Sequence, residues 1–239
     1  MSGIDCVNYV ITHKPCEIKQ DGLYRGLCVG GLRLDGMMCE LDGENIAEYN
    51  ERINETTGLY WMWKNADSEY LGLSHYRRWF FNARYPGDES RLDAERIEEI
   101  LVLNGYDMIL TNQYVFHDSV FDGIVSSINY NYALAVEGYN VFLEELREKH
   151  PEYVSAFHGV MKDRPAYLKG MFVTRREIVN AYCEWLFSFL PEAADRIDVS
   201  GFSPGARERR VAGFFAEFLW TVWMSMHKYR VFTLPYPLV

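Results

Sequence analysis

The chain has 239 residues, of which 49% are hydrophobic and 24% are charged, a composition typical of one globular domain with a sizeable core. Its formal net charge of −10 argues against nucleic-acid binding by the fold as a whole, so an anionic ligand would need a local cationic pocket. No apolar run approaches the roughly 20 residues of a membrane span, and the N-terminus lacks a signal-peptide pattern, so we expect a cytoplasmic protein.

Several kinds of site lack support from motifs. The five cysteines contain no Cys-x-x-Cys pair, which argues against a zinc site or a disulfide framework. The sequence has no glycine-rich dinucleotide or P-loop motif, no serine-hydrolase elbow and no His-Glu-x-x-His. Aromatic residues reach 15%, which is consistent either with a tyrosine-rich core or with a surface that stacks on planar or sugar rings.

The first predicted strand runs from Cys6 to Thr12, a stretch of β-branched and aromatic residues. Thr12, His13 and Lys14 stand at its carboxyl end, where open α/β sheets place their ligands. His13 and Lys14 could contact a nucleotide there, or they could be solvated loop residues.

A glycine-rich stretch over residues 16–44 predicts loops with one short strand at 27–32. From Ile46 the apolar residues recur at helical spacing as far as Trp63, but polar residues and a glycine interrupt the middle, so a broken helix is expected. Asn50 lies on its polar side. Lys64 and Asn65 close it, and stabilisation of the helix end is the structural alternative to a ligand role for Lys64.

The next predicted strand, Tyr70 to His75, runs directly into Tyr76, Arg77 and Arg78. Two arginines after a buried strand can form forked, charge-assisted hydrogen bonds to a diphosphate. Alternatively, one arginine pairs with a nearby carboxylate and the other faces water. The residue types leave both possibilities open.

The remaining elements alternate between strands and helices, which indicates an α/β sheet. Predicted helices cover residues 93–103, 141–149, 176–190 and 210–227, with Gly105 after the first and Pro191 ending the third; predicted strands cover residues 106–111 and 167–174, and an extended tail covers 229–235.

Glu217 is an isolated acid on the otherwise apolar last helix. A carboxylate in such surroundings is either paired with a cation or positioned for chemistry. If it faces a pocket, burial would raise its pKa and suit it to general-base catalysis. The alternative is a salt bridge to Arg207, Arg209 or Arg210.

Several motifs occur together and in order. They are Thr-His-Lys at 12–14, Asp-Gly-x-Asn-Ile at 42–46, Tyr-Trp-x-Trp-Lys-Asn at 60–65, Gly-Leu-x-His-Tyr-Arg-Arg at 72–78, Met-Phe-Val at 171–173, Tyr-Cys-Glu-Trp-Leu-Phe at 182–187 and Gly-x-x-Ala-Glu-x-Leu at 213–219. Over nearly the whole chain this series resembles the bacterial capsular-polysaccharide glycosyltransferase domain catalogued as domain of unknown function 4422.

The resemblance implies a GT-A-like nucleotide-sugar-binding fold, with a central, mostly parallel sheet flanked by helices and a helical C-terminal part. It implies a single domain over residues 1–239. Residues 1–115, approximately, would form the half that binds the nucleotide sugar, and residues 116–239, approximately, the helical half on the acceptor side.

The resemblance also implies an activity: transfer of a hexose from a nucleotide sugar, with a uridine diphosphate sugar as first choice, to an oligosaccharide or lipid-linked glycan. A lipid-linked acceptor would place the cytoplasmic protein at the inner face of the membrane, with peripheral association possible. The implied catalytic residues are Glu217, Arg77 and Arg78. The implied donor-binding residues are Thr12, His13, Lys14, Asn50, Lys64, Asn65, His75 and Tyr76.

The chain departs from the expected pattern at three points. Many GT-A enzymes hold Mg²⁺ or Mn²⁺ with Asp-x-Asp, a motif this sequence lacks; His-Tyr-Arg-Arg occupies that place. A cationic pair could replace the metal in stabilising the leaving diphosphate, so we assign no metal ligand and expect weak or absent metal dependence. Gly170 and Phe218 stand where the family usually has Asn and Arg, which keeps open a non-catalytic carbohydrate- or nucleotide-binding module as an alternative function.

Overall fold

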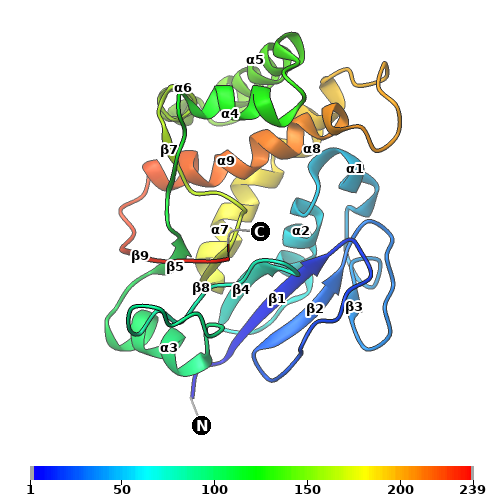
Figure 1. Ribbon diagram of the computed structural model, residues 1–239. Helices are drawn as coiled ribbons and strands as arrows, with labels where there is room; N and C mark the ends of the chain where they lie inside the picture. Colours follow the sequence, from blue (N-terminus) through cyan, green and yellow to red (C-terminus); the bar gives the residue numbers. More distant parts are fainter. Residues whose placement is uncertain (1–2, 238–239) are drawn as a thin grey trace.

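A seven-stranded sheet forms the base of the computed structural model, which describes residues 3–237 (Figure 1). The strand order is β3-β2-β1-β4-β8-β5-β9. The pairs that include β8 are antiparallel and the others are parallel, which confirms the predicted α/β fold with a mostly parallel sheet. The strands are β1 (Cys6–Thr12), β2 (Tyr24–Cys28), β3 (Met38–Cys39), β4 (Tyr70–His75), β5 (Met108–Thr111), β8 (Phe172–Arg175) and β9 (Val231–Leu234).

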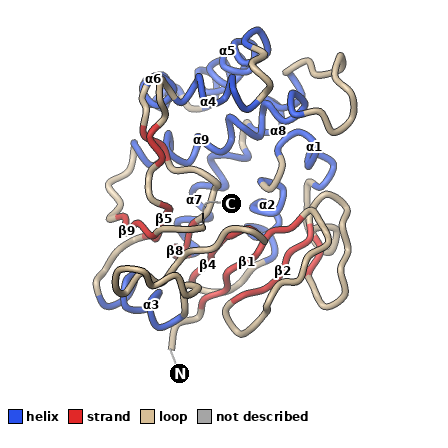
Figure 2. Tube along the Cα trace, viewed as in Figure 1, coloured by secondary structure: helices blue, strands red, loops and turns tan. Residues whose placement is uncertain are grey.

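Most of the helices gather on one side of the sheet, as the blue segments of Figure 2 show. They are α1 (Asn50–Ile53), α2 (Thr56–Asn65), α4 (Val120–Ser127), α5 (Tyr132–Lys149), α6 (Val154–Lys162), α7 (Arg176–Phe187), α8 (Leu190–Arg196) and α9 (Val211–Ser225). The short helix α3 (Ala94–Glu98) lies apart from them, and a small second sheet pairs β6 (Tyr114–Val115) with β7 (Pro165–Ala166). Within residues 3–237, no helix is both long and apolar enough to cross a membrane.

Alternation of side chains along the strands explains why both faces of the sheet are covered. Val7 and Leu71 pack in the large core cluster with α2 and α7. Their neighbours Cys6 and Tyr70 point the other way, into a smaller cluster with Ile97 and other residues of the segment 80–101. The central strands are therefore buried on both sides, and their ligand-accessible part is restricted to their ends.

The helix predicted from Ile46 onward is broken, as expected. A short 3-10 turn (Ala47–Tyr49) leads into α1, and Asn54, with a φ of 54°, separates α1 from α2. The helix predicted over 93–103 is α3 followed by a π-helical turn (Glu99–Leu103). Gly105 follows with a φ of 66°, consistent with its predicted place after the helix end.

Other predicted boundaries were wrong. The strand predicted at 167–174 begins only at Phe172, because Lys169 and Gly170 both adopt positive φ angles, of 73° and 57°. Pro191 does not end a helix but lies in the first turn of α8, where proline is tolerated. The strand predicted at 27–32 corresponds to β2, which begins earlier, at Tyr24, and ends at Cys28. The extended tail contains β9, which pairs in parallel with β5.

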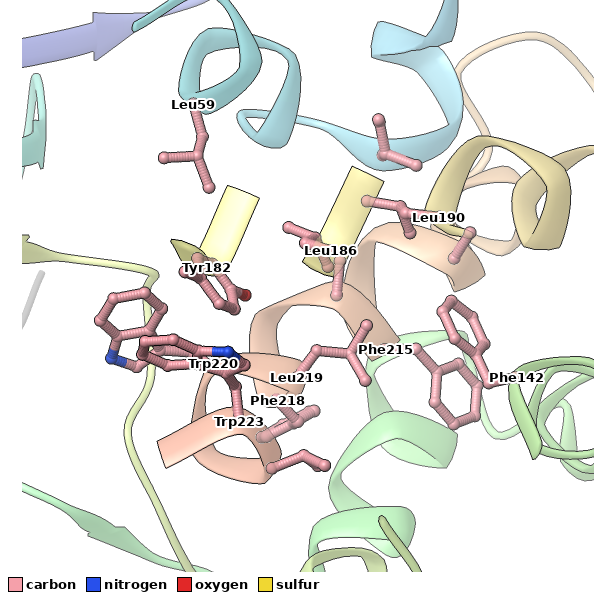
Figure 3. Close-up of a cluster of buried hydrophobic side chains, with 14 of the residues drawn as sticks. Leu59, Phe142, Tyr182, Leu186, Leu190, Phe215, Phe218, Leu219, Trp220 and Trp223 are labelled. Carbon is pink, nitrogen blue, oxygen red and sulfur yellow. The ribbon is translucent and has the colours of Figure 1, made fainter. Parts of the chain in front are cut away.

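The large core is rich in aromatic rings, several of which are labelled in Figure 3. Phe215 of α9 stacks on Phe142 of α5 with ring centroids 5.0 Å apart. Tyr182 of α7 meets Trp220 of α9 edge to face at 4.2 Å. These contacts hold α9 between α5 and α7, so they determine where Glu217 of the same helix lies.

We predict that Phe215→Ala lowers the free energy of unfolding by about 3–5 kcal/mol, because the ring is fully buried and its loss leaves a cavity. Urea denaturation followed by circular dichroism would measure the change. The matched control is Phe214→Ala, since this neighbouring ring is half-buried and should cost about 1 kcal/mol. Equal losses for the two variants would contradict the assignment of Phe215 to the helix-to-helix core.

Candidate functional site

A cavity of about 410 Å³ opens at the carboxyl ends of β1, β2 and β4. We call it the first cavity. Its lining combines these strand ends with α1, the beginning of α2 and two residues from the C-terminal half: Ile11, His13, Val29, Gly30, Ala47, Glu48, Asn50, Glu51, Asn54, Glu55, His75, Tyr76, Arg77, Arg78, Lys169 and Arg210. Its size falls within the range of small-molecule sites.

The segment after β4 forms a tight turn that presents two arginines to this cavity. The backbone N–H of His75 donates to Arg78 O at 2.9 Å, and the N–H of Arg78 donates to His75 O at 3.0 Å. Tyr76 is tied to β1 through its N–H, which donates to Ile11 O at 3.1 Å. Arg77 is therefore at the exposed tip of a fixed turn, with its guanidinium 5.0 Å from the centre of the Tyr76 ring.

Positive charge in the first cavity is only partly neutralised. Among residues 3–237, Arg77 and Arg210 form no salt bridge. Glu51 lies in the lining but is paired with Arg209 at 2.9 Å. The backbone N–H of Gly205 and then Arg209 lower the pKa of Glu51. The lining holds four Arg and Lys side chains against three Glu side chains, so the site can attract an anion although the protein as a whole is acidic.

The pKa of His13 is affected by this positive charge. Partial burial lowers its pKa first, and the positive charges of Lys14, Arg210 and Arg77 lower it further, while Glu55 opposes them. The imidazole also meets the Tyr76 ring edge to face, at 5.7 Å between centroids. The lowered pKa of His13 therefore reflects both its partial burial and its nearness to the cationic side chains of the first cavity.

The backbone of one residue, Lys169, links His75 to Glu217. The backbone N–H of Lys169 donates to Glu217 Oε1 at 2.5 Å, and its carbonyl oxygen lies 2.6 Å from His75 Nε2. Because a carbonyl only accepts, Nε2 of His75 carries the proton. The Lys169 ammonium forms a second contact with the same carboxylate, because its Nζ lies 3.8 Å from Glu217 Oε1. The left-handed backbone of Lys169 allows its N–H and C=O to reach both side chains.

Glu217 lines a second cavity, of about 480 Å³. Arg78 and Lys169 line both cavities, so they form the boundary between the two. The partner of Glu217 is Lys169, whereas a salt bridge to the arginines at 207, 209 or 210 does not form. Arg207 instead donates to Ser127 O, Arg209 pairs with Glu51, and Arg210 lines the first cavity.

The structure brings some of the predicted residues together and separates others. Four of the eight donor-binding candidates line the first cavity: His13, Asn50, His75 and Tyr76. Thr12 and Lys14 do not. Thr12 Oγ1 donates to Lys14 O at 2.7 Å and accepts from Lys14 N at 3.2 Å, so its hydroxyl closes the turn that presents His13.

Lys64 and Asn65 lie outside the first cavity, at the end of α2, whereas the beginning of that helix approaches β1. Lys64 Nζ is 3.4 Å from Glu44 Oε1 and 3.7 Å from the centre of the Trp63 ring. Asn65 Nδ2 donates to Glu44 O and to Trp61 O, each with a length close to 2.9 Å. Both side chains hold the preceding loop against the helix.

Three residues of the site were missed by sequence reasoning. Arg210 and Lys169 reach the first cavity from the C-terminal half, and no motif marks them. The third, Glu40, is fully buried, and its Oε1 accepts from the N–H of Gly30 in the cavity wall. Burial raises the pKa of Glu40, and the hydrogen bonds that it accepts from Thr57 and the N–H groups of Gly30 and Gly31 oppose this effect. No motif distinguishes Glu40 from the other acidic residues of this glycine-rich stretch.

The residues after β4 do not suit a divalent metal ion. Mg²⁺ and Mn²⁺ prefer carboxylate and carbonyl oxygens, whereas this turn offers two guanidinium groups and a histidine whose Nε2 is already bound to Lys169 O. Within residues 3–237, no cluster of three or more His, Cys, Asp or Glu side chains is arranged to hold a metal.

Comparisons with known proteins agree with this architecture. Residues 8–228 match the family described as Domain of unknown function (DUF4422). No curated protein matches the chain. Among solved structures, the apo structure of WbbM, a bifunctional glycosyltransferase, is similar with a TM-score of 0.83 at 24% identity. The match covers 97% of this chain but 45% of that one, so the chain spans less than half the length of WbbM. The likeness shows a shared fold, and the predicted GT-A-like fold is confirmed.

We predict that Arg210→Gln raises the pKa of His13 toward the ordinary value for histidine, because it removes one positive charge that disfavours the imidazolium. NMR titration of the imidazole resonances would measure the shift. His227 is an internal control, since burial alone lowers its pKa and the substitution should leave it unchanged. A wild-type His13 that titrates at or above the ordinary value would contradict the proposed clustering of cations.

Proposed function

Since the chain belongs to the family described as Domain of unknown function (DUF4422), and shares its fold with a bifunctional glycosyltransferase, we propose that it is itself a glycosyltransferase. It transfers a hexose from a nucleotide sugar, with a uridine diphosphate sugar as the first candidate, to a cell-surface polysaccharide or other glycan. The observation that carries the proposal is the presence of Arg77 and Arg210, which form no salt bridge within residues 3–237, in a ligand-sized cavity at the carboxyl edge of the sheet.

The first cavity is the proposed donor site. A nucleotide sugar carries its charge in the middle, on the diphosphate, with the nucleoside at one end and the neutral sugar ring at the other. The cationic turn at Arg77 and Arg78, together with Arg210, would face the diphosphate. His13 and Asn50 lie at the ends of β1 and in α1, where the nucleoside would lie. Residues from both halves of the chain line this cavity, so the proposed halves at about 1–115 and 116–239 share the donor site.

In the proposed reaction, the bond between the anomeric carbon and the diphosphate oxygen breaks, and its electron pair leaves with the diphosphate. Arg77, Arg78 and Arg210 stabilise the charge that develops on this leaving group, which is the role that a metal ion has in many related folds. An acceptor hydroxyl forms the new bond to the anomeric carbon, and its proton passes to Glu217. Lys169 keeps that carboxylate in place through its backbone N–H.

A cytoplasmic location is part of the same proposal. The donor is a cytoplasmic metabolite class, and a lipid-linked acceptor would bring the protein to the inner face of a membrane as a peripheral protein.

We predict that uridine diphosphate binds the wild-type protein and that Arg77→Gln and Arg210→Gln each weaken binding about tenfold, because each removes a charge-assisted contact. Isothermal titration calorimetry would measure the affinities. Arg147→Gln is the charge-matched control, since Arg147 is exposed on α5. Adding EDTA should leave the affinity unchanged. The proposal fails if no nucleoside diphosphate binds below millimolar concentration, or if Arg77→Gln binds as the wild type does.

We predict that Glu217→Gln reduces sugar transfer by about 100-fold while the affinity for uridine diphosphate changes less than about twofold. The amide oxygen can still accept from Lys169 N–H, but it cannot take a proton. Steady-state kinetics with radiolabelled donor would measure turnover. Glu184→Gln, at an exposed position on α7, is the control. Undiminished transfer would remove Glu217 from the mechanism, and donor binding without any turnover by the wild type would favour the non-catalytic module.

A further inference from the structure

The second cavity has an aromatic wall made by Tyr114, Phe116, Phe218 and Tyr236. The Tyr114 and Phe116 rings meet edge to face at 4.8 Å, and Phe116 meets Phe218 in the same way at 5.7 Å. Tyr114 remains 50% exposed although it is a large ring. A large, half-exposed ring in a cavity of this size is typical of a binding surface rather than of a core.

This wall is held rigidly in place. Tyr114 lies on β6, which pairs with β7 in the small antiparallel sheet. The backbone of Phe116 forms two hydrogen bonds with Arg164. Its N–H donates to Arg164 O at 2.9 Å, and its carbonyl accepts from Arg164 Nε at 2.7 Å. Its ring lies directly on Gly123 of α4, where an added Cβ would be 2.3 Å from the ring. A ligand would therefore meet a preformed surface.

Charge in the second cavity is confined to one end. Arg78 and Lys169 form the boundary with the first cavity, and the Lys169 ammonium is balanced by Glu217 at 3.8 Å. The rest of the lining, from α4, β6 and the C-terminal segment, carries no charged side chain. A ligand that fills the uncharged part would reach the Glu217 carboxylate with one end, next to the place where the two cavities meet.

We propose that the second cavity binds a neutral hexose ring of the acceptor glycan. The C–H face of a pyranose packs on the Tyr114 and Phe116 rings, and one hydroxyl points at Glu217. At the aromatic wall, away from the end that holds Arg78 and Lys169, such a ring fits better than a phosphate or an acidic sugar, whose charge would lose water without gaining a partner at the wall. The assignment rests on the proposed transferase function, because it takes the ligand of the first cavity to be the donor.

The test compares sugar binding with nucleotide binding in the same full-length protein. Saturation-transfer NMR would follow methyl β-D-galactopyranoside and methyl β-D-glucopyranoside, with and without uridine diphosphate, and calorimetry would follow uridine diphosphate. The variants are Tyr114→Ala, which removes the ring, and Tyr114→Phe, which keeps it. Tyr85→Ala is the control, since Tyr85 is 67% exposed and lies outside both cavities.

The wild type is expected to bind at least one of these glycosides with a Kd on the order of 1–10 mM. Tyr114→Ala should weaken that binding about tenfold, while Tyr114→Phe and Tyr85→Ala behave as the wild type and all four proteins bind uridine diphosphate equally. The inference is overturned if neither glycoside binds the wild type, or if Tyr114→Ala leaves sugar binding intact. It is also overturned if Tyr114→Ala weakens nucleotide binding instead, because the cavity would then belong to the donor.

These outcomes separate the inference from the proposed function. Sugar binding that depends on Tyr114, in a protein that binds no nucleoside diphosphate, would support a sugar site while refuting the transferase. Nucleotide binding by a protein whose sugar binding does not depend on Tyr114 would refute the sugar site and leave the proposed transferase function standing.

Discussion

The backbone of Lys169 connects the parts of the site. Its N–H holds Glu217 on α9, and its carbonyl holds His75 at the end of β4. A left-handed conformation at a residue other than glycine costs about 1–2 kcal/mol. A hydrogen bond to a carboxylate contributes about 1.5–3 kcal/mol, so the contact with Glu217 can offset that cost. The strained turn thus couples the position of the helical half to the end of the sheet.

Gly170 extends this turn with a second left-handed residue. Its φ is 57°, and an added Cβ would meet no atom within 4 Å. Asparagine tolerates this conformation better than other non-glycine residues do. The glycine that stands where the resemblance led us to expect asparagine is therefore compatible with the same backbone, and it leaves the contacts of Lys169 intact.

Fold and site differ in how far they could be predicted. Strands such as β4 were located to the residue, because a buried run that ends in charged residues has few alternatives. The start of β8 and the role of Pro191 were missed, since both depend on turns that tertiary contacts stabilise. Lys64 shows that a motif does not by itself identify a residue of the site. It belongs to a distinctive motif, yet the motif's polar end holds a loop through Glu44. Arg210 carries no motif, yet it lies in the first cavity.

The α/β class, the location of most elements and the cationic turn after β4 could be predicted from the sequence, because hydrophobic periodicity and strand ends are local properties of the chain. Three features became visible only in the folded chain: which cations share a cavity, the pairing of Glu217 with Lys169, and the meeting of two cavities at Arg78 and Lys169. Side chains that are far apart in the sequence, such as those of Arg77 and Arg210, meet only when the helices pack on the sheet. A charged residue on the surface of one element gives no local sign of the partner that packing will bring to it.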